Sequence, residues 1–219
     1  MGKRSAIGVL FMRELRSEWR NKYAMSGILL YLLSIIFLIT FTFEETDDRT
    51  WMVLYWIAIL FTSVNAVAKS FLQESEGRQY YFYTLASPQH IILAKMAYNA
   101  VVMVVMSGLA LLFYIATQGY PVEDDASFLL AMLLGALAFA STFSMISAVA
   151  SRAANNGTLT AILSFPILLP VMRILIRVSL LALTGQNLAM NAQDLLYLAA
   201  LNIFIVVLAL ILFPYLWRD

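Results

Sequence analysis

Residues with chemically reactive side chains are few in this sequence and stand far apart. The single histidine is His90, and cysteine is absent, which excludes disulfides and thiolate chemistry. The serines and aspartates that could complete a triad with His90 lie across long apolar runs that we assign below to a membrane. No G-x-x-x-x-G-K-[ST] segment occurs, so ATP cannot be bound in the P-loop manner. We therefore expect no catalytic site, no metal site and no cofactor held by this chain.

One polar segment, KSFLQESEGRQYYFYTLASPQHIILAK from Lys69 to Lys95, interrupts the apolar sequence. It is short for an enzymatic domain but long for a plain turn. Ser87-Pro88 is a typical helix start, with serine as the N-cap and proline at the first helical position. The next helix should therefore begin near Gln89, and Gly77 can end the preceding one.

The aromatic run Tyr80–Tyr83 in the middle of this segment permits two interpretations. Its rings can form an interfacial belt at the head-group level of a membrane. Alternatively, the run belongs to a short transverse helix that fits a cleft in a soluble subunit. In that case segment 69–92 is a docking surface, with the candidate residues Glu74, Glu76, Gly77, Arg78, Tyr80, Tyr83 and Pro88.

Two prolines and two arginines form a second unusual constellation. Pro166 and Pro170 remove two helical hydrogen bonds and are predicted to kink or break their helix. Arg173 and Arg177 follow at the same i, i+4 spacing, on one face. For a helix entering near Gly157, they lie about 24 and 30 Å along it, near the outer edge of the hydrocarbon. Either they snorkel to the head groups, or they line an outer vestibule and meet an anionic group such as a propionate or a partner's carboxylate.

Six long apolar runs make up most of the chain. The sequence is 62% hydrophobic and 12% charged, whereas soluble domains carry roughly 25% charged residues. A helix of about 20 apolar residues crosses a bilayer, and period-two alternation is absent, so we predict an all-α membrane protein. Two asparagines within the runs, Asn65 and Asn202, are expected to bond between helices. The predicted spans of this single domain, residues 1–219, are approximately 24–43, 51–68, 93–117, 127–150, 158–183 and 195–216.

Positive charge is concentrated on one side of these spans. Of the 14 Lys and Arg residues, all except Arg49, Arg173 and Arg177 fall in the two terminal segments or the second and fourth connections. Cytoplasmic segments carry the excess of Lys and Arg, so both termini and the Lys69–Lys95 segment are predicted to face the cytoplasm. The opposite, acidic connections are Glu44–Thr50, Gly119–Asp125 and Thr184–Asp194.

The N-terminal segment 1–22 is expected to form an amphipathic helix on the cytoplasmic membrane surface. It is too charged for a cleavable signal peptide, so the first span should stay as an anchor. Arginines recur at i, i+3, i+7 and can meet anionic lipids, but two glutamates share the side of the apolar positions. A positive-inside anchor and a contact with a partner subunit both remain open. The charged residues concerned are Arg13, Glu14, Arg16, Glu18 and Arg20.

Six spans with both ends inside, a surface helix and a charged second connection resemble the permease subunits of ABC-2-type transporters. More narrowly, the chain resembles the haem-exporter protein B (CcmB) family of cytochrome c maturation over nearly its whole length. Tyr80–Tyr83 and the pair Arg173 and Arg177 depart from the family pattern, so no family role transfers to them. The matching stretches are Arg13–Lys22, Phe71–Glu74, Glu76-Gly77, Leu85, Pro88, Leu93–Lys95, and the run from Asn155 through Pro166 and Pro170.

The resemblance implies a bacterial inner-membrane protein that forms a homodimer. Each copy would engage a cytosolic ATPase subunit through the Glu74–Pro88 region, so ATP would be bound by the partner. It also implies assembly with a haem-handling membrane protein and a haem chaperone of the same pathway. ATP hydrolysis would then drive release of the haem-loaded chaperone or export of haem, with haem as a transported or complex-bound ligand. No nucleic acid is expected as a partner.

Two alternatives stay open at this point. A permease of the same architecture could export another substrate, such as a drug, a lipid or a polysaccharide. A membrane scaffold or channel that needs no ATPase would also account for the six spans. Retention of an ATPase subunit during purification separates the last interpretation from the other two.

Overall fold

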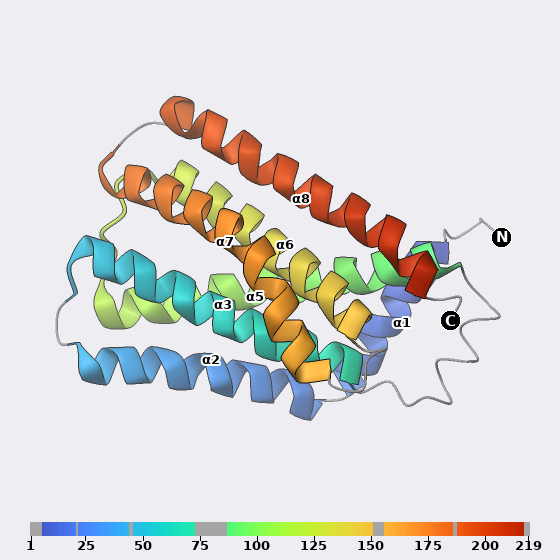
Figure 1. Ribbon diagram of the computed structural model, residues 1–219. Helices are drawn as coiled ribbons and strands as arrows, with labels where there is room; N and C mark the ends of the chain where they lie inside the picture. The colour runs from blue at the N-terminus through green and yellow to red at the C-terminus, as the bar shows by residue number, and fades with distance from the viewer. Residues whose placement is uncertain are drawn as a thin grey trace.

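The computed structural model describes residues 6–20, 22–43, 46–72, 87–150, 156–185 and 188–216, and within these ranges the regular structure is all helical. Six of the helices, α2 to α8, are long and apolar enough to cross a membrane. The prediction of an all-α protein with six spans is thereby confirmed. The helices are α1 (Ala6–Arg20), α2 (Lys22–Thr42), α3 (Asp48–Leu72), α5 (Pro88–Gln118), α6 (Asp125–Ala150), α7 (Asn156–Leu183) and α8 (Leu188–Leu216), drawn in Figure 1.

The long helices lie side by side in one bundle, with α6 at its centre. α6 packs against α3, α5, α7 and α8, while α2 packs against α1, α3 and α5. The short helix α1 lies at one end of the bundle, where α8, the last described helix, also ends (Figure 1). We call this the α1 end, and the opposite end, which holds the connection between α5 and α6, the turn end.

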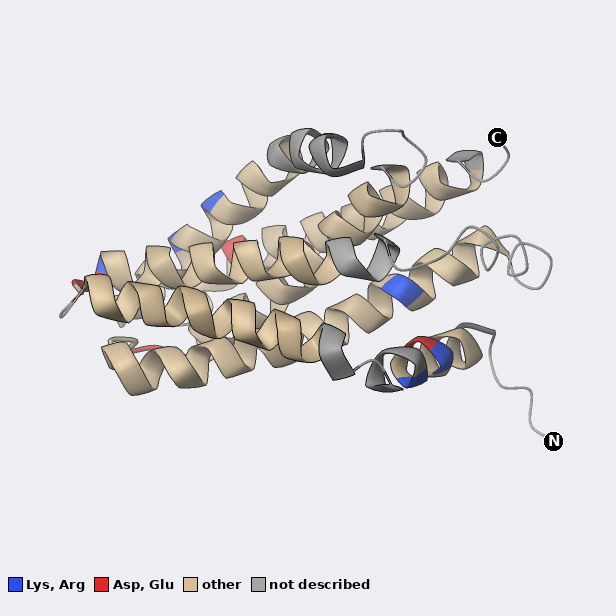
Figure 2. Cartoon of the chain, turned by 90° about the horizontal axis from the view of Figure 1, so that it is seen from below, with Lys and Arg blue, Asp and Glu red and all other residues tan. Residues whose placement is uncertain are grey.

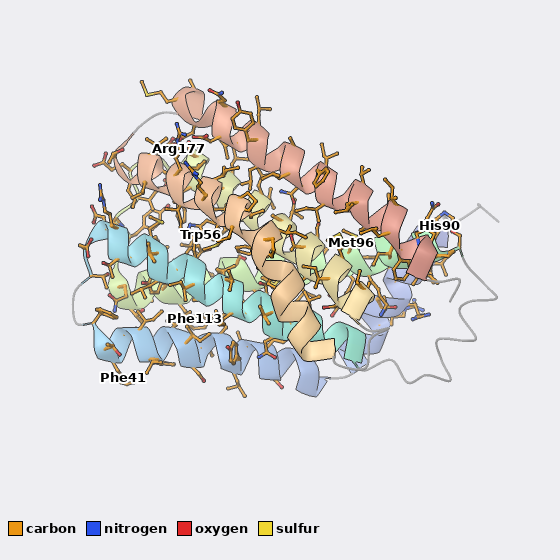
Figure 3. The ribbon with its side chains drawn as sticks, viewed as in Figure 1. Phe41, Trp56, His90, Met96, Phe113 and Arg177 are labelled. Atoms are coloured by element: carbon orange, nitrogen blue, oxygen red, sulfur yellow. The ribbon has the colours of Figure 1, made fainter. Side chains whose placement is uncertain are left out.

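Apolar side chains cover the outward surface of the spans, as lipid contact requires. Phe41 on α2 is 84% exposed and points away from the bundle in Figure 3. Leu196 and Ile203 on α8 are exposed in the same way. The described charged residues lie mostly near the ends of the bundle, and tan segments fill most of its length in Figure 2.

A cluster of aromatic rings fills the core toward the turn end. Trp51 and Tyr55 stack on successive turns of α3 with ring centroids 5.9 Å apart, and Phe128 of α6 lies against both. The Trp51 indole N–H donates to the carbonyl of Gly119 at 3.0 Å. A buried indole needs such an acceptor, so this ring connects α3 to the end of α5.

Polar side chains also join the spans. Asn99 of α5 donates to the hydroxyl of Ser144 in α6 at 2.8 Å. Asn202 of α8 donates to the carbonyl of Leu134 in α6 at 3.2 Å, which confirms its predicted role between helices. The amide of Asn65 makes no hydrogen bond with the described residues, and its expected role there is not confirmed.

The structure corrects two local predictions. Residues 188–194, expected as part of a loop, form the first turns of α8, because Asp194 has a partner within the bundle and need not face water. The predicted break at Pro166 and Pro170 is also absent, since α7 is continuous through both, whereas the alternative, a kink, stays a prediction. Both prolines are exposed, so their rings disturb no buried contact, and a proline φ near −65° is compatible with a helix.

Candidate functional site

The predicted docking segment is described only at its two flanks. α3 ends at Leu72 and α5 begins at Pro88, so both flanks lead into helices of the bundle. The docking role of this segment stays a prediction. The residues that lie outside the described part of the chain are Glu74, Glu76, Gly77, Arg78, Tyr80 and Tyr83.

The start of α5 follows the sequence prediction, with Ser87 at the N-cap and Pro88 in the first turn. The Ser87 side chain, however, makes no capping bond to the backbone. Its hydroxyl lies 2.7 Å from Nδ1 of His90, while the His90 backbone N–H donates to the Ser87 carbonyl at 3.0 Å. Nδ1 of the single histidine is thus engaged within its own helical turn, at the α1 end (Figure 3).

Helix α1 folds back onto the bundle and packs against α5 and α2. Phe11 and Leu15 are described apolar side chains of α1 that pack against the core. Glu14 pairs with the neighbouring Arg13 at 2.8 Å. The apolar side chains of Val9 and Met12 lie on another face of α1, which is exposed and which no described residue covers.

Lys95 is a buried cation that the sequence did not reveal. The predicted span 93–117 already includes Lys95, and the residue lies inside α5 with only 3% of its surface exposed. A buried ammonium group requires polar partners. The signal that could have found it is the apolar run Ile91–Met96, in which Lys95 is the only charged residue.

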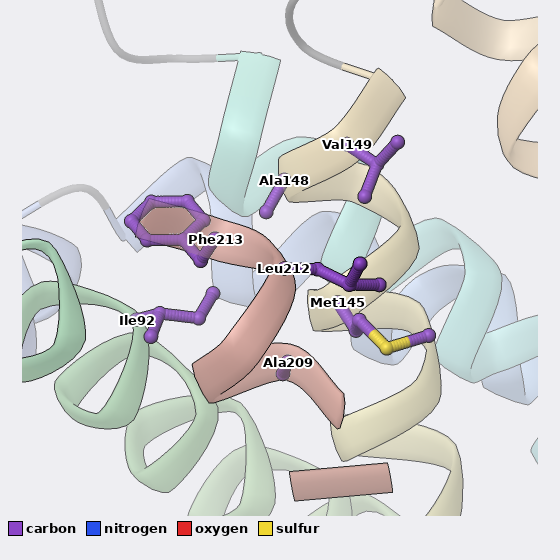
Figure 4. A pocket seen from close by; sticks show the side chains of 7 residues that line it. All are labelled: Ile92, Met145, Ala148, Val149, Ala209, Leu212 and Phe213. Atoms are coloured by element: carbon purple, nitrogen blue, oxygen red, sulfur yellow. The ribbon is translucent and has the colours of Figure 1, made fainter. Parts of the chain in front are cut away.

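An apolar recess lies between α5, α6 and α8 near the α1 end, and Figure 4 shows it from close by. None of its lining side chains carries a hydrogen-bonding group. The lining side chains leave no room for a water molecule in the recess, and they offer no group that could orient a polar ligand. Its lining residues are Ile92, Met145, Ala148, Val149, Ala209, Leu212 and Phe213.

The predicted pair of arginines lies on α7 in the half of the helix nearer the turn end. Nε of Arg177 lies 3.0 Å from Oδ2 of Asp194 on α8. The Arg177 side chain is 71% exposed and that of Asp194 only 11%, so the ion pair sits at the surface of the α7–α8 seam. Arg173 is also exposed and has no ion-pair partner within the described chain.

Hydrogen bonds close the turn end. The backbone N–H groups of Glu123 and Asp124 both donate to the carbonyl of Ala182 near the end of α7. The Asp124 carboxylate accepts from the Ser127 hydroxyl at 2.5 Å, and Asn191 of α8 donates to that hydroxyl at 3.1 Å. The α5–α6 connection thus caps the end of α7, and Ser127 at the start of α6 contacts α8. The first of these contacts satisfies a carbonyl that would otherwise be exposed at the end of a helix.

Two titratable groups at the turn end have shifted pKa values. Burial raises the pKa of the Tyr120 hydroxyl above its usual range, and its hydrogen bond to Asp125, at 2.6 Å, adds to the rise. Hydrogen bonds from Thr50 hold the pKa of Asp47 below its usual value. Both groups therefore keep their ordinary charge states near neutral pH, and neither is prepared for proton transfer.

A bundle of six apolar spans, with charged groups mainly toward its ends, defines a multi-pass membrane protein. The sequence model of one family, described as CcmB protein, matches residues 5–215. The chain belongs to the CcmB family, whose members are permeases linked to haem handling in cytochrome c biogenesis, and the resemblance seen in the sequence is confirmed. No individual curated protein matches the chain.

Proposed function

We propose that this chain is the membrane-spanning subunit of an ABC transporter complex in cytochrome c biogenesis, with ATP bound and hydrolysed by a separate cytosolic subunit. The observation that carries the proposal is the match to the CcmB family over residues 5–215. The sequence has no P-loop, so the energy must come from a partner. In this proposal two copies of the chain form a homodimer, and each copy binds one ATPase subunit.

The α1 end is proposed to face the cytoplasm. The basic N-terminal segment and the connection between α3 and α5 would then lie on the side where Lys and Arg are in excess. The membrane is proposed to be the bacterial inner membrane. This orientation presents α1 and the docking segment to the ATPase.

The flanks of the docking segment suggest how movement would reach the spans. α5 starts at Pro88, directly after the segment, and packs against α1, α2, α3, α6 and α8. A push on the segment would therefore be transmitted to most of the bundle through one rigid helix. The output that we propose is release of a haem-loaded chaperone from a haem-handling membrane protein, or export of haem.

Co-purification tests the docking assignment. Replacing Glu74 and Glu76 by lysine should abolish retention of the ATPase subunit in mild detergent while the chain still inserts in the membrane. Neutralising Asp47 and Asp48 to asparagine, at the turn end, is the control and should leave retention unchanged. Retention unaffected by the double lysine change would contradict the docking assignment. If the unaltered chain retains no ATPase, a scaffold that works without ATP becomes the better explanation.

A further inference from the structure

One side of α7 differs from the lipid-facing sides of the other spans. Its exposed residues recur at three- and four-residue spacing and therefore line a single stripe along the helix. Leu169 is its apolar member, with 54% of the side chain exposed. In Figure 2, blue segments interrupt the tan ribbon of this helix. The stripe consists of Pro166, Leu169, Pro170, Arg173 and Arg177.

Both arginines lie within α7, some distance before its end at the turn end of the bundle. α7 ends at Leu183, so Arg177 is about 9 Å and Arg173 about 15 Å from that end at 1.5 Å per residue. A similar distance from the turn end follows from the neighbouring helix α6. Gly135 lies against Leu175 and is about 15 Å from the start of α6. Where the end of α7 marks the edge of the hydrocarbon, an exposed guanidinium at this depth is unfavourable against acyl chains alone.

The described chain supplies only one anion for the two cations. Asp194 contacts Arg177 at Nε, and 71% of the Arg177 side chain is exposed. α7 packs against α3, α6 and α8, and no other carboxylate on these helices forms an ion pair with it in the described chain. One positive charge on the stripe is therefore not balanced. The charged residues on the three neighbouring helices are Asp48, Arg49, Lys69, Asp125 and Asp194.

A second copy of the chain seated on the stripe would not supply the missing charge. A two-fold axis along the membrane normal brings identical residues together at the same depth, so Arg173 would face Arg173. Like charges placed against each other at an interface oppose association. With no counter-charge from a second copy, the anion is either a carboxylate of another protein or a bound group.

We propose that Arg173 and Arg177 bind the anionic head of an amphiphile, whose apolar part lies along Leu169 and the two prolines. Guanidinium groups present planar pairs of donors that match the oxygens of a phosphate or a carboxylate. Asp194 orients Arg177 for this contact, and Arg173 contributes the unbalanced charge. The head group could be the phosphate of an acidic phospholipid or the carboxylate of another amphiphile, and two probes separate these sources.

The first probe is phosphatidylglycerol. The full chain is placed in phosphatidylcholine nanodiscs that contain a small fraction of phosphatidylglycerol, and the lipid retained after return to neutral detergent is counted by native mass spectrometry. Arg173→Gln is the informative variant, because it leaves the Arg177–Asp194 pair intact. Losing one charge-assisted contact should weaken retention about tenfold. Arg49→Gln removes another exposed cation toward the turn end and should have no effect.

The second probe is metal-free protoporphyrin, an apolar ring with two carboxylates, titrated by fluorescence into discs of phosphatidylcholine alone. Weaker binding to Arg173→Gln but not to Arg49→Gln identifies a carboxylate amphiphile as a ligand, and the same pattern for phosphatidylglycerol identifies the lipid. The proposal is overturned if neither probe distinguishes the variants. It is also overturned if Arg173→Gln changes only the oligomeric mass, since a second copy would then cover the stripe. No ATPase is present in either assay, so failure of the proposed coupling cannot mimic these results.

Discussion

The indole N–H of Trp56 in α3 donates to the hydroxyl of Ser179 in α7 across 2.9 Å. Both residues are fully buried, and the same indole ring also packs against Gly135 of α6. Three spans therefore meet at one side chain, which lies behind α7 in Figure 3. A hydrogen bond between two buried groups fixes the relative positions of these helices more strictly than apolar packing alone.

Ser179→Ala should destabilise the protein because it leaves the buried indole N–H without an acceptor. The expected cost is about 1–3 kcal/mol, and it should appear as a lower Tm in detergent. Ser34→Ala is the matched control, since the Ser34 hydroxyl bonds only to a carbonyl of its own helix at an exposed position. If the two serine variants unfold at the same temperature, the Trp56–Ser179 bond does not stabilise the bundle.

Two glycines within helices should respond in opposite directions to alanine. A Cβ at Gly135 would lie 2.9 Å from the Trp56 ring and 3.0 Å from Leu175, so the packing of α3 and α7 on α6 would have to shift. We expect Gly135→Ala to cost about 1–3 kcal/mol, as overpacked cores do. A Cβ at Gly108 meets nothing within 4 Å, and there alanine should stabilise α5 by about 0.5–1 kcal/mol. Thermal unfolding of both variants checks the pair of signs, and a stabilised Gly135→Ala would contradict this packing.

The apolar pattern was sufficient to predict the number of spans, because each run of about 20 apolar residues has few alternatives to a membrane helix. Ser87-Pro88 placed the start of α5 correctly for a similarly local reason: an N-cap and a first-turn proline act on their own turn. Features of this kind depend on neighbouring residues only. They can be recognised without knowing how the helices pack.

Charges inside the bundle could not be placed in the same way. Asp194 was expected in the connection Thr184–Asp194 and Lys95 at the cytoplasmic edge of the span 93–117, because a charged residue beside an apolar run usually marks its end. Both residues are buried instead: Lys95 lies in α5, against which α1 packs, and Asp194 meets Arg177 across the α7–α8 seam. These contacts join residues that are distant in the sequence, so single-sequence periodicity contains no signal for them.

Gly185, in the turn after α7, should not tolerate alanine. Its φ of +66° is rarely adopted by other residues, and a Cβ there would collide with the carboxylate of Glu123. We expect Gly185→Ala to lower the stability by about 1–2 kcal/mol or more, through backbone strain and the collision together. Gly119→Ala is the matched control, since Gly119 has a φ of +77° but open space around its Cβ position, so it reports the backbone cost alone. Adding Glu123→Ala to Gly185→Ala should then restore the part of the Tm that the collision removes. If the double variant is no more stable than Gly185→Ala, the collision contributes nothing, and the requirement for glycine is a matter of backbone conformation only.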